Sequence, residues 1–147
     1  MRRSVVNEVG EQFASRAEQT RHDFTMNVDF DESVTVNGNE TQLKQVLINL
    51  LENALKFTPR KGSIALSLER KDDHAILTVS DTGIGIPPED LPHLFERFHR
   101  GRNSSAFPGN GLGLAIVKAI VDVHGGTVEA HSNGKDAGSI YTITLPA

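Results

Sequence analysis

The chain has 147 residues, of which 37% are hydrophobic and 23% are charged, a composition typical of a soluble globular protein. That length is enough for one domain with a sizeable core and too short for two ordinary ones. The net charge of −4 excludes the basic field of a nucleic-acid binder, and the lack of cysteine excludes disulfides, thiolate metal sites and a cysteine nucleophile.

Hydrophobic periodicity divides the chain into alternating helical and extended segments. The second helix has clear limits, because Asn39 with Gln42 three residues later is typical of a capping box and Thr58–Pro59 stops the pattern. Strict alternation makes 63–69 and 75–80 the firmest predicted strands. In chain order, we expect a helix at 5–21, a strand pair at 24–28 and 34–36, a helix at 39–58, strands at 63–69 and 75–80, helices at 87–98 and 112–123, and strands at 127–130 and 139–145.

This interleaving predicts the fold class, because several strands are joined by hairpins rather than by long crossovers. We expect an α/β (α+β) two-layer sandwich, with a mixed, largely antiparallel sheet covered on one face by about three helices. Residues 1–147 should form one domain. The aperiodic segment at about 99–110 combines arginines with Gly, Ser and Pro, as a mobile cationic lid would.

One face of the second helix collects polar side chains. At about 100° per residue, Asn49, Asn53 and Lys56 lie within about 60° of each other beside the apolar arc. In isolation such a trio is more often a solvated flank, and only the neighbouring motifs favour a site. An asparagine oxygen is a hard, neutral ligand suited to Mg²⁺, which makes Asn53 the candidate metal ligand. Lys56, one turn on, would meet a phosphate as a point charge.

Asp81 has the strand parity of the apolar residues before it, so its carboxylate should point to the buried side of the sheet and needs a donor there. An adenine amino group would supply one, and an Asx turn that opens the DTG loop is an equally good interpretation. Gly83 and Gly85 permit positive φ and a close approach of the backbone to a flat ring.

The segment GNGLGL places three glycines before an apolar helix, so that amides and the helix N-terminus would face an anion such as phosphate. A simple glycine turn into the helix is the alternative, and the spacing fits neither a Rossmann nor a Walker loop. The six histidines lack ligand spacing and no Ser-His-Asp order stands out. A histidine metal site and nucleophilic hydrolysis are therefore not expected.

Four segments in order, QVLINLLENALKFTP, DTGIGIP, FERFHR and GNGLGLAIVK, resemble the N, G1, F and G2 boxes of sensor histidine kinases. These kinases belong to the ATPase superfamily shared with gyrase, Hsp90 and MutL. The resemblance covers nearly the whole chain and implies the Bergerat fold, with ATP and Mg²⁺ as cofactors.

By that likeness Asp81 would bind the adenine amino group and Asn53 would hold Mg²⁺, while Asn49 and Lys56 would meet the phosphates. In the mechanism that we expect, Lys56, the metal and Arg97 or Arg100 offset phosphate charge. Further implied nucleotide contacts come from the G1 and G2 boxes and one hydroxyl of the last strand: Gly83, Gly85, Ile86, Gly109, Asn110, Gly111, Leu112, Gly113, Leu114 and Thr142.

Two departures from the family pattern stand out. Asn110 replaces the more usual threonine of the G2 box, which affects only a lid contact. The family's H-E-x-x-T-P-like phosphoacceptor segment has no counterpart, since His22 lies in the dissimilar TRHDFTM. We therefore expect the ATP-binding portion of a longer kinase, which donates the γ-phosphate to a histidine on a separate dimerisation domain and does not phosphorylate itself in isolation.

The resemblance also implies partners and a setting. An aspartate of a response regulator would receive the phosphoryl group, and nucleic acid is not an expected partner. No apolar run approaches the ~20 residues of a membrane span, and the polar start does not resemble a secretory signal. We expect a monomeric cytoplasmic domain without direct membrane contact, within a homodimeric parent kinase that is anchored in the membrane.

Three other functions fit parts of the pattern. A hydrolytic ATPase like Hsp90, gyrase or MutL carries glutamate one turn before the metal-binding asparagine, where this chain has Asn49, which cannot take a proton from water. A serine kinase of the anti-sigma-factor type usually has that glutamate and lacks FERFHR. A nucleotide-sensing module without transfer activity would have the same pocket, and the sequence does not distinguish it.

Overall fold

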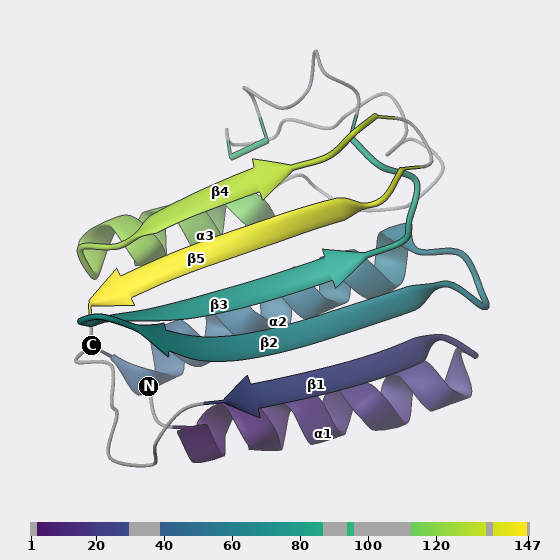
Figure 1. Ribbon diagram of the computed structural model, residues 1–147, viewed down its shortest axis with the longest axis horizontal. Coiled ribbons are helices and arrows are strands. Elements are labelled where there is room, and N and C mark those ends of the chain that lie inside the picture. The colour runs from purple at the N-terminus through teal and green to yellow at the C-terminus, as the bar shows by residue number, and fades with distance from the viewer. Residues whose placement is uncertain (1–2, 30–38, 87–93, 96–112, 135–136, 147) are drawn as a thin grey trace.

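The computed structural model describes residues 3–29, 39–86, 94–95, 113–134 and 137–146. These residues form two layers, a five-stranded sheet and three helices that all cover the same face of it (Figure 1). The predicted two-layer sandwich is confirmed. Within the described residues, no helix is long and apolar enough to cross a membrane.

The sheet is mixed, with the strand order β1-β2-β3-β5-β4. β1 runs parallel to β2, and the other neighbouring strands are antiparallel. The helices are α1 (Arg3–Gln19), α2 (Glu40–Phe57) and α3 (Gly113–Val123), and the strands are β1 (Asp23–Asp29), β2 (Ser63–Lys71), β3 (His74–Asp81), β4 (Thr127–His131) and β5 (Ser139–Pro146).

Two of the predicted elements cannot be compared with the structure. The strand at 34–36 lies outside the described residues, and β1 pairs along its whole length with β2. Of the helix predicted at 87–98, only 94–95 are described.

α2 begins and ends where its sequence predicts. The side chain of Asn39 accepts a hydrogen bond from the backbone N–H of Gln42 at 3.0 Å, which satisfies one of the free amides of the first turn. The helix ends at Phe57, with Thr58 as its C-cap before Pro59. One side of α2 packs into the core through Leu43, Val46, Leu47, Leu50, Leu51 and Ala54. This packing fixes the direction in which the polar flank of the helix faces.

The helix-facing side of the sheet is apolar along most of its length and polar at one end. On β3 every second residue is buried, and Asp81 continues the row formed by Ala75, Leu77 and Val79. On β5 the buried row starts with Ser139 and Tyr141. Because Asp81 pairs with Ser139 across the two strands, their side chains leave the sheet next to each other.

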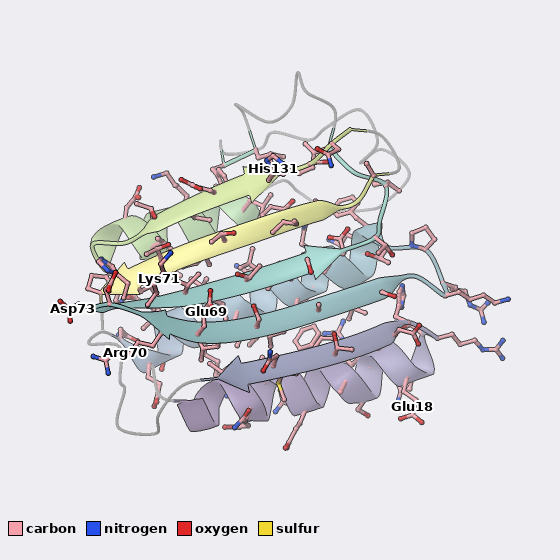
Figure 2. The ribbon with its side chains drawn as sticks, viewed as in Figure 1. Glu18, Glu69, Arg70, Lys71, Asp73 and His131 are labelled. Carbon is pink, nitrogen blue, oxygen red and sulfur yellow. The ribbon has the colours of Figure 1, made fainter. Side chains whose placement is uncertain are left out.

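The charged side chains of the β2–β3 hairpin gather at the opposite end of the sheet. Figure 2 shows Glu69, Arg70, Lys71 and Asp73 around this turn, whereas β3 runs away from it towards the end that carries Asp81. The charged hairpin and the polar pair at the end of β3 are therefore separate features.

Candidate functional site

A buried carboxylate marks the end of β3. Asp81 is only 8% exposed, and its Oδ1 accepts a hydrogen bond from the backbone N–H of Gly83 at 2.8 Å. Its Oδ2 accepts from the hydroxyl of Ser139 at 2.9 Å. Burial raises the pKa of Asp81 above its ordinary value of 3.8, and the hydrogen bonds from Gly83 and Ser139 lower it by less.

The structure confirms that Asp81 points to the buried side, and it contains the Asx-type bond to Gly83 that was the alternative interpretation. This bond does not exclude a ligand. An ionised carboxylate has about four lone-pair positions, and the two bonds of Asp81 use two of them. A further donor, such as an amino group, can still be accommodated.

The hydroxyl beside Asp81 belongs to Ser139, whereas Thr142, the residue that we expected near the base, lies on the other face of β5. Thr142 is three residues further along β5, so it faces the side of the sheet that α1, α2 and α3 do not cover, where it pairs with Thr78. Counting by twos back from the buried Ile143 would have found Ser139.

A second polar contact joins α2 to β5. The side-chain Nδ2 of Asn53 donates a hydrogen bond to the hydroxyl oxygen of Tyr141 at 3.3 Å. Tyr141 is 3% exposed, and burial, followed by the negative charge of Asp81, raises the pKa of its hydroxyl. The bond engages the amide nitrogen of Asn53, so its oxygen is the atom that a metal would use. Sequence reasoning did not identify Tyr141.

The remaining predicted residues of α2 lie on the same flank. Asn49, one turn before Asn53, is half-buried, and its Oδ1 accepts a hydrogen bond from Nε2 of Gln45 at 2.7 Å. Lys56 is exposed. The structure therefore brings Asn53 close to the Asp81 end of the sheet through Tyr141. On α2, Asn53 lies between the neutral amide of Asn49 and the cation of Lys56.

The loop after β3 is held between the end of α2 and the segment before β5. The N–H of Ile84 donates to the carbonyl of Phe57 at 3.0 Å, and the N–H of Gly138 donates to the carbonyl of Gly83 at 3.2 Å. Ile86 is 6% exposed, and its N–H donates to the hydroxyl of Ser132 at 3.0 Å. The loop is thus a fixed wall beside Asp81.

The two glycines of this loop serve different purposes. Gly85 has φ of +76°, as expected for a glycine that permits left-handed backbone, and a Cβ there would collide with the carbonyl oxygen of Gly134. Gly83 is not among the residues with positive φ. It is required by close packing instead, because a Cβ would meet the carbonyl oxygen of Phe57.

Only part of the predicted phosphate side is described. Gly113 is the first residue of α3, and Leu114 is half-buried and packs against the core. The other candidates lie outside the described residues, together with the lid predicted at 99–110: Arg97, Arg100, Gly109, Asn110, Gly111 and Leu112.

The metal candidate is consistent with the surrounding residues. Within the described ranges, no group of three or more His, Cys, Asp or Glu side chains could hold a metal ion. An ion at Asn53 would have the neutral amide oxygen of that side chain as a ligand. That situation suits Mg²⁺, which is usually held by one or two protein ligands together with phosphate oxygens and water.

A hollow of about 380 Å³ lies at the same end of the sheet, and Asp81 and Ser139 are among the residues that line it. Its lining also includes Ala65 and Ile140, which alternate with the buried residues of β2 and β5 and so face away from the helices. α2 and its polar flank lie on the other side of the sheet.

A family model described as Histidine kinase-, DNA gyrase B-, and HSP90-like ATPase matches residues 38–147. The chain therefore belongs to this ATPase family, which carries nucleotide binding as its shared property. The resemblance to sensor histidine kinases is confirmed by named relatives as well. The signal transduction histidine-protein kinase/phosphatase MprB of Mycolicibacterium vanbaalenii is 38% identical over 148 aligned positions, which cover 96% of this chain and 30% of MprB.

Solved structures agree with this assignment. The catalytic domain of histidine kinase ThkA has a TM-score of 0.83 and 30% identity, covering 97% of this chain and 92% of that one. ThkA in complex with the response regulator protein TrrA matches 97% of this chain and 39% of that one, with a TM-score of 0.78 and 28% identity. The chain spans between 11% and 30% of the first curated relatives it matches.

Proposed function

We propose that the chain is a catalytic domain that binds Mg·ATP and donates the γ-phosphate to a histidine on a separate phosphoacceptor domain. The observation that carries the proposal is the buried Asp81, held by Ser139 and Gly83 at the end of β3, with Asn53 of α2 close by. Family membership supports the nucleotide, and the kinase relatives support the acceptor.

Asp81 favours adenine over guanine for a chemical reason. The carboxylate is an acceptor, and adenine presents a donating amino group at its six position where guanine presents an accepting carbonyl. Because Asp81 is buried, an accepting group opposite it would leave both groups unsatisfied. Residues 82–86, held by Phe57 and Gly138, would form the wall along the base.

The α2 flank would bind the polyphosphate. The amide oxygen of Asn53 would hold Mg²⁺, and the exposed ammonium of Lys56 would offset phosphate charge. When bound, Mg²⁺ would neutralise charge on the phosphate oxygens and so favour transfer. Asn49 would contact the phosphates from the preceding turn.

Phosphoryl transfer to histidine fits this chain better than hydrolysis. An amide cannot act as a general base, and the oxygen of Asn49 already accepts a hydrogen bond from Gln45. Hydrolysis of ATP would need a base for water at this place. A neutral imidazole nitrogen has its own lone pair, which attacks the γ-phosphorus while the bond to ADP breaks, and no base is required on this chain.

The proposed partners are the phosphoacceptor domain of a longer kinase and a response regulator that receives the phosphoryl group. The complex of ThkA with a response regulator supports this arrangement, since ThkA matches 97% of the present chain. We place the domain in the cytoplasm, as part of a homodimeric parent kinase anchored in the membrane.

Two experiments test the proposal. Calorimetry should show binding of Mg·ATP to the chain, and Asp81→Asn and Asn53→Ala should each weaken it. Incubation with γ-labelled ATP should label a separately produced phosphoacceptor hairpin on histidine and leave the chain itself unlabelled. Strong self-phosphorylation, or ATP turnover in the absence of an acceptor, would overturn the assignment.

A further inference from the structure

Tyr141 carries a hydroxyl that packing alone does not require. The side chain is 3% exposed and lies in the core cluster, in the same row of β5 as Ile143 and Leu145. Phenylalanine would fill nearly the same volume without a polar group. Burying a polar group costs free energy unless it is hydrogen-bonded. Nδ2 of Asn53 donates a hydrogen bond to this hydroxyl at 3.3 Å, and the hydroxyl of Ser139 is also close to it.

This contact determines which end of the Asn53 amide faces the site. The terminal torsion of asparagine is broad and roughly two-fold, and its oxygen and nitrogen ends have nearly the same shape. Only the oxygen end can bind a cation. With Nδ2 bonded to Tyr141, the oxygen is the end directed away from the buried phenol.

The charge of Asp81 supports the same orientation. Its carboxylate lies close enough to the buried phenol of Tyr141 to act on it electrostatically. A negative charge attracts the hydrogen of the hydroxyl, which leaves the lone pairs of the oxygen for the donor on Asn53. The carboxylate assigned to adenine and the amide assigned to the metal are thus linked through one tyrosine.

We propose that Tyr141 is a positioning residue that holds Asn53 with its amide oxygen available to the Mg²⁺ of the bound nucleotide. The inference rests on the function proposed above, in which Asn53 is the metal ligand. It concerns the preorganisation of that ligand, and Tyr141 itself touches neither metal nor nucleotide.

The test compares ATP affinity in Mg²⁺ with ATP affinity in EDTA, because their ratio measures the metal's contribution. Tyr141→Phe should reduce this ratio roughly two- to tenfold, the fold-change that corresponds to the net strength of one hydrogen bond, and leave the affinity in EDTA unchanged. Thr144→Val removes a hydroxyl from the opposite face of the same strand and should change neither value. An unchanged ratio in Tyr141→Phe, or an equal loss under both conditions, would overturn the inference.

A double-mutant cycle separates this inference from the proposed function. Asn53→Ala should abolish most of the metal enhancement, and adding Tyr141→Phe to it should cause no further loss, since Tyr141 acts through Asn53. If Asn53→Ala leaves the enhancement intact, the metal assignment fails. If Asn53→Ala abolishes it while Tyr141→Phe has no effect, only the positioning role fails.

A second readout needs no substitution at Tyr141. Tyr141 is the only tyrosine and the chain has no tryptophan, so intrinsic fluorescence reports on this phenol alone. Adding Mg²⁺ to the ATP-loaded chain should change the emission of the wild type and leave that of Asn53→Ala unchanged. Equal changes in both proteins, or none in the wild type, would count against the link.

Discussion

The hydroxyl of Ser139 donates a hydrogen bond to Oδ2 of Asp81 over 2.9 Å, at the position where β3 and β5 pair these two residues. The bond reaches across 58 positions of sequence. It stabilises a carboxylate that burial alone would disfavour, and it fixes the direction in which the remaining lone pairs of Asp81 point.

Ser139→Ala should weaken ATP binding about three- to tenfold, since one charge-assisted hydrogen bond is lost and the carboxylate becomes harder to keep ionised. Thr142→Val is the matched control on the same strand, and calorimetry should find its affinity unchanged because Thr142 faces away from Asp81. A larger effect at Thr142 than at Ser139 would contradict the strand parity.

Asp81→Asn should separate binding from stability. The amide oxygen can still accept from the N–H of Gly83, and the buried charge is removed, so the free energy of unfolding should change by less than about 1 kcal/mol. Affinity for ATP should fall at least about tenfold, because the amide presents a donor to the adenine amino group as readily as an acceptor. Denaturant titration and calorimetry on the same samples measure both. Parallel losses would indicate a purely structural carboxylate.

The pH dependence of stability should carry the signature of a raised carboxyl pKa. Because burial lifts the pKa of Asp81 above 3.8, the folded state holds this proton more tightly than the unfolded state. The resulting stabilisation is complete below about pH 3.8 and is lost as pH rises through the raised pKa. Urea titrations should show that the free energy of unfolding of the wild type falls relative to that of Asp81→Asn as pH rises in this window. A wild-type free energy of unfolding that rises relative to that of Asp81→Asn would contradict this prediction.

Substitutions at two glycines with positive φ should have unequal costs. Gly134→Ala adds a methyl group where no atom lies within 4 Å, so only backbone strain of about 1–2 kcal/mol is expected. Gly85→Ala adds backbone strain at φ +76° and also a collision with the carbonyl oxygen of Gly134, so it should cost clearly more and weaken ATP binding. Thermal unfolding compares the two. Equal costs would show that the loop yields easily.

His124 should stabilise the junction between α2 and α3. Its Nδ1 donates to the carbonyl of Ile120 at 2.7 Å and its Nε2 accepts from the N–H of Asn39 at 3.0 Å. His124→Ala should lower the free energy of unfolding by about 1–2 kcal/mol, because both bonds are lost. His74, exposed at the start of β3, is the control and should tolerate alanine in the same denaturant titration. Equal effects would remove any special role for His124.

Local patterns in the sequence were sufficient for several parts of this protein. The cap at Asn39, the stop at Thr58 and the alternation of β3 depend on neighbours within a few residues, so periodicity and turn chemistry predicted them. The inward direction of Asp81 followed from the same alternation. The boxes that resemble sensor histidine kinases are likewise short local segments, and they indicated the family before any strand was paired.

Other features depend on which strands and helices meet, and only the tertiary structure decided them. The parallel pairing of β1 with β2 is one such feature. The positions of Ser139 beside Asp81 and of Tyr141 under Asn53 are others. The sequence by itself determined the family, the main elements and the buried face of β3, since local periodicity carries that information. The polar partners of the site were decided by strand register and helix packing between distant segments, which no local pattern records.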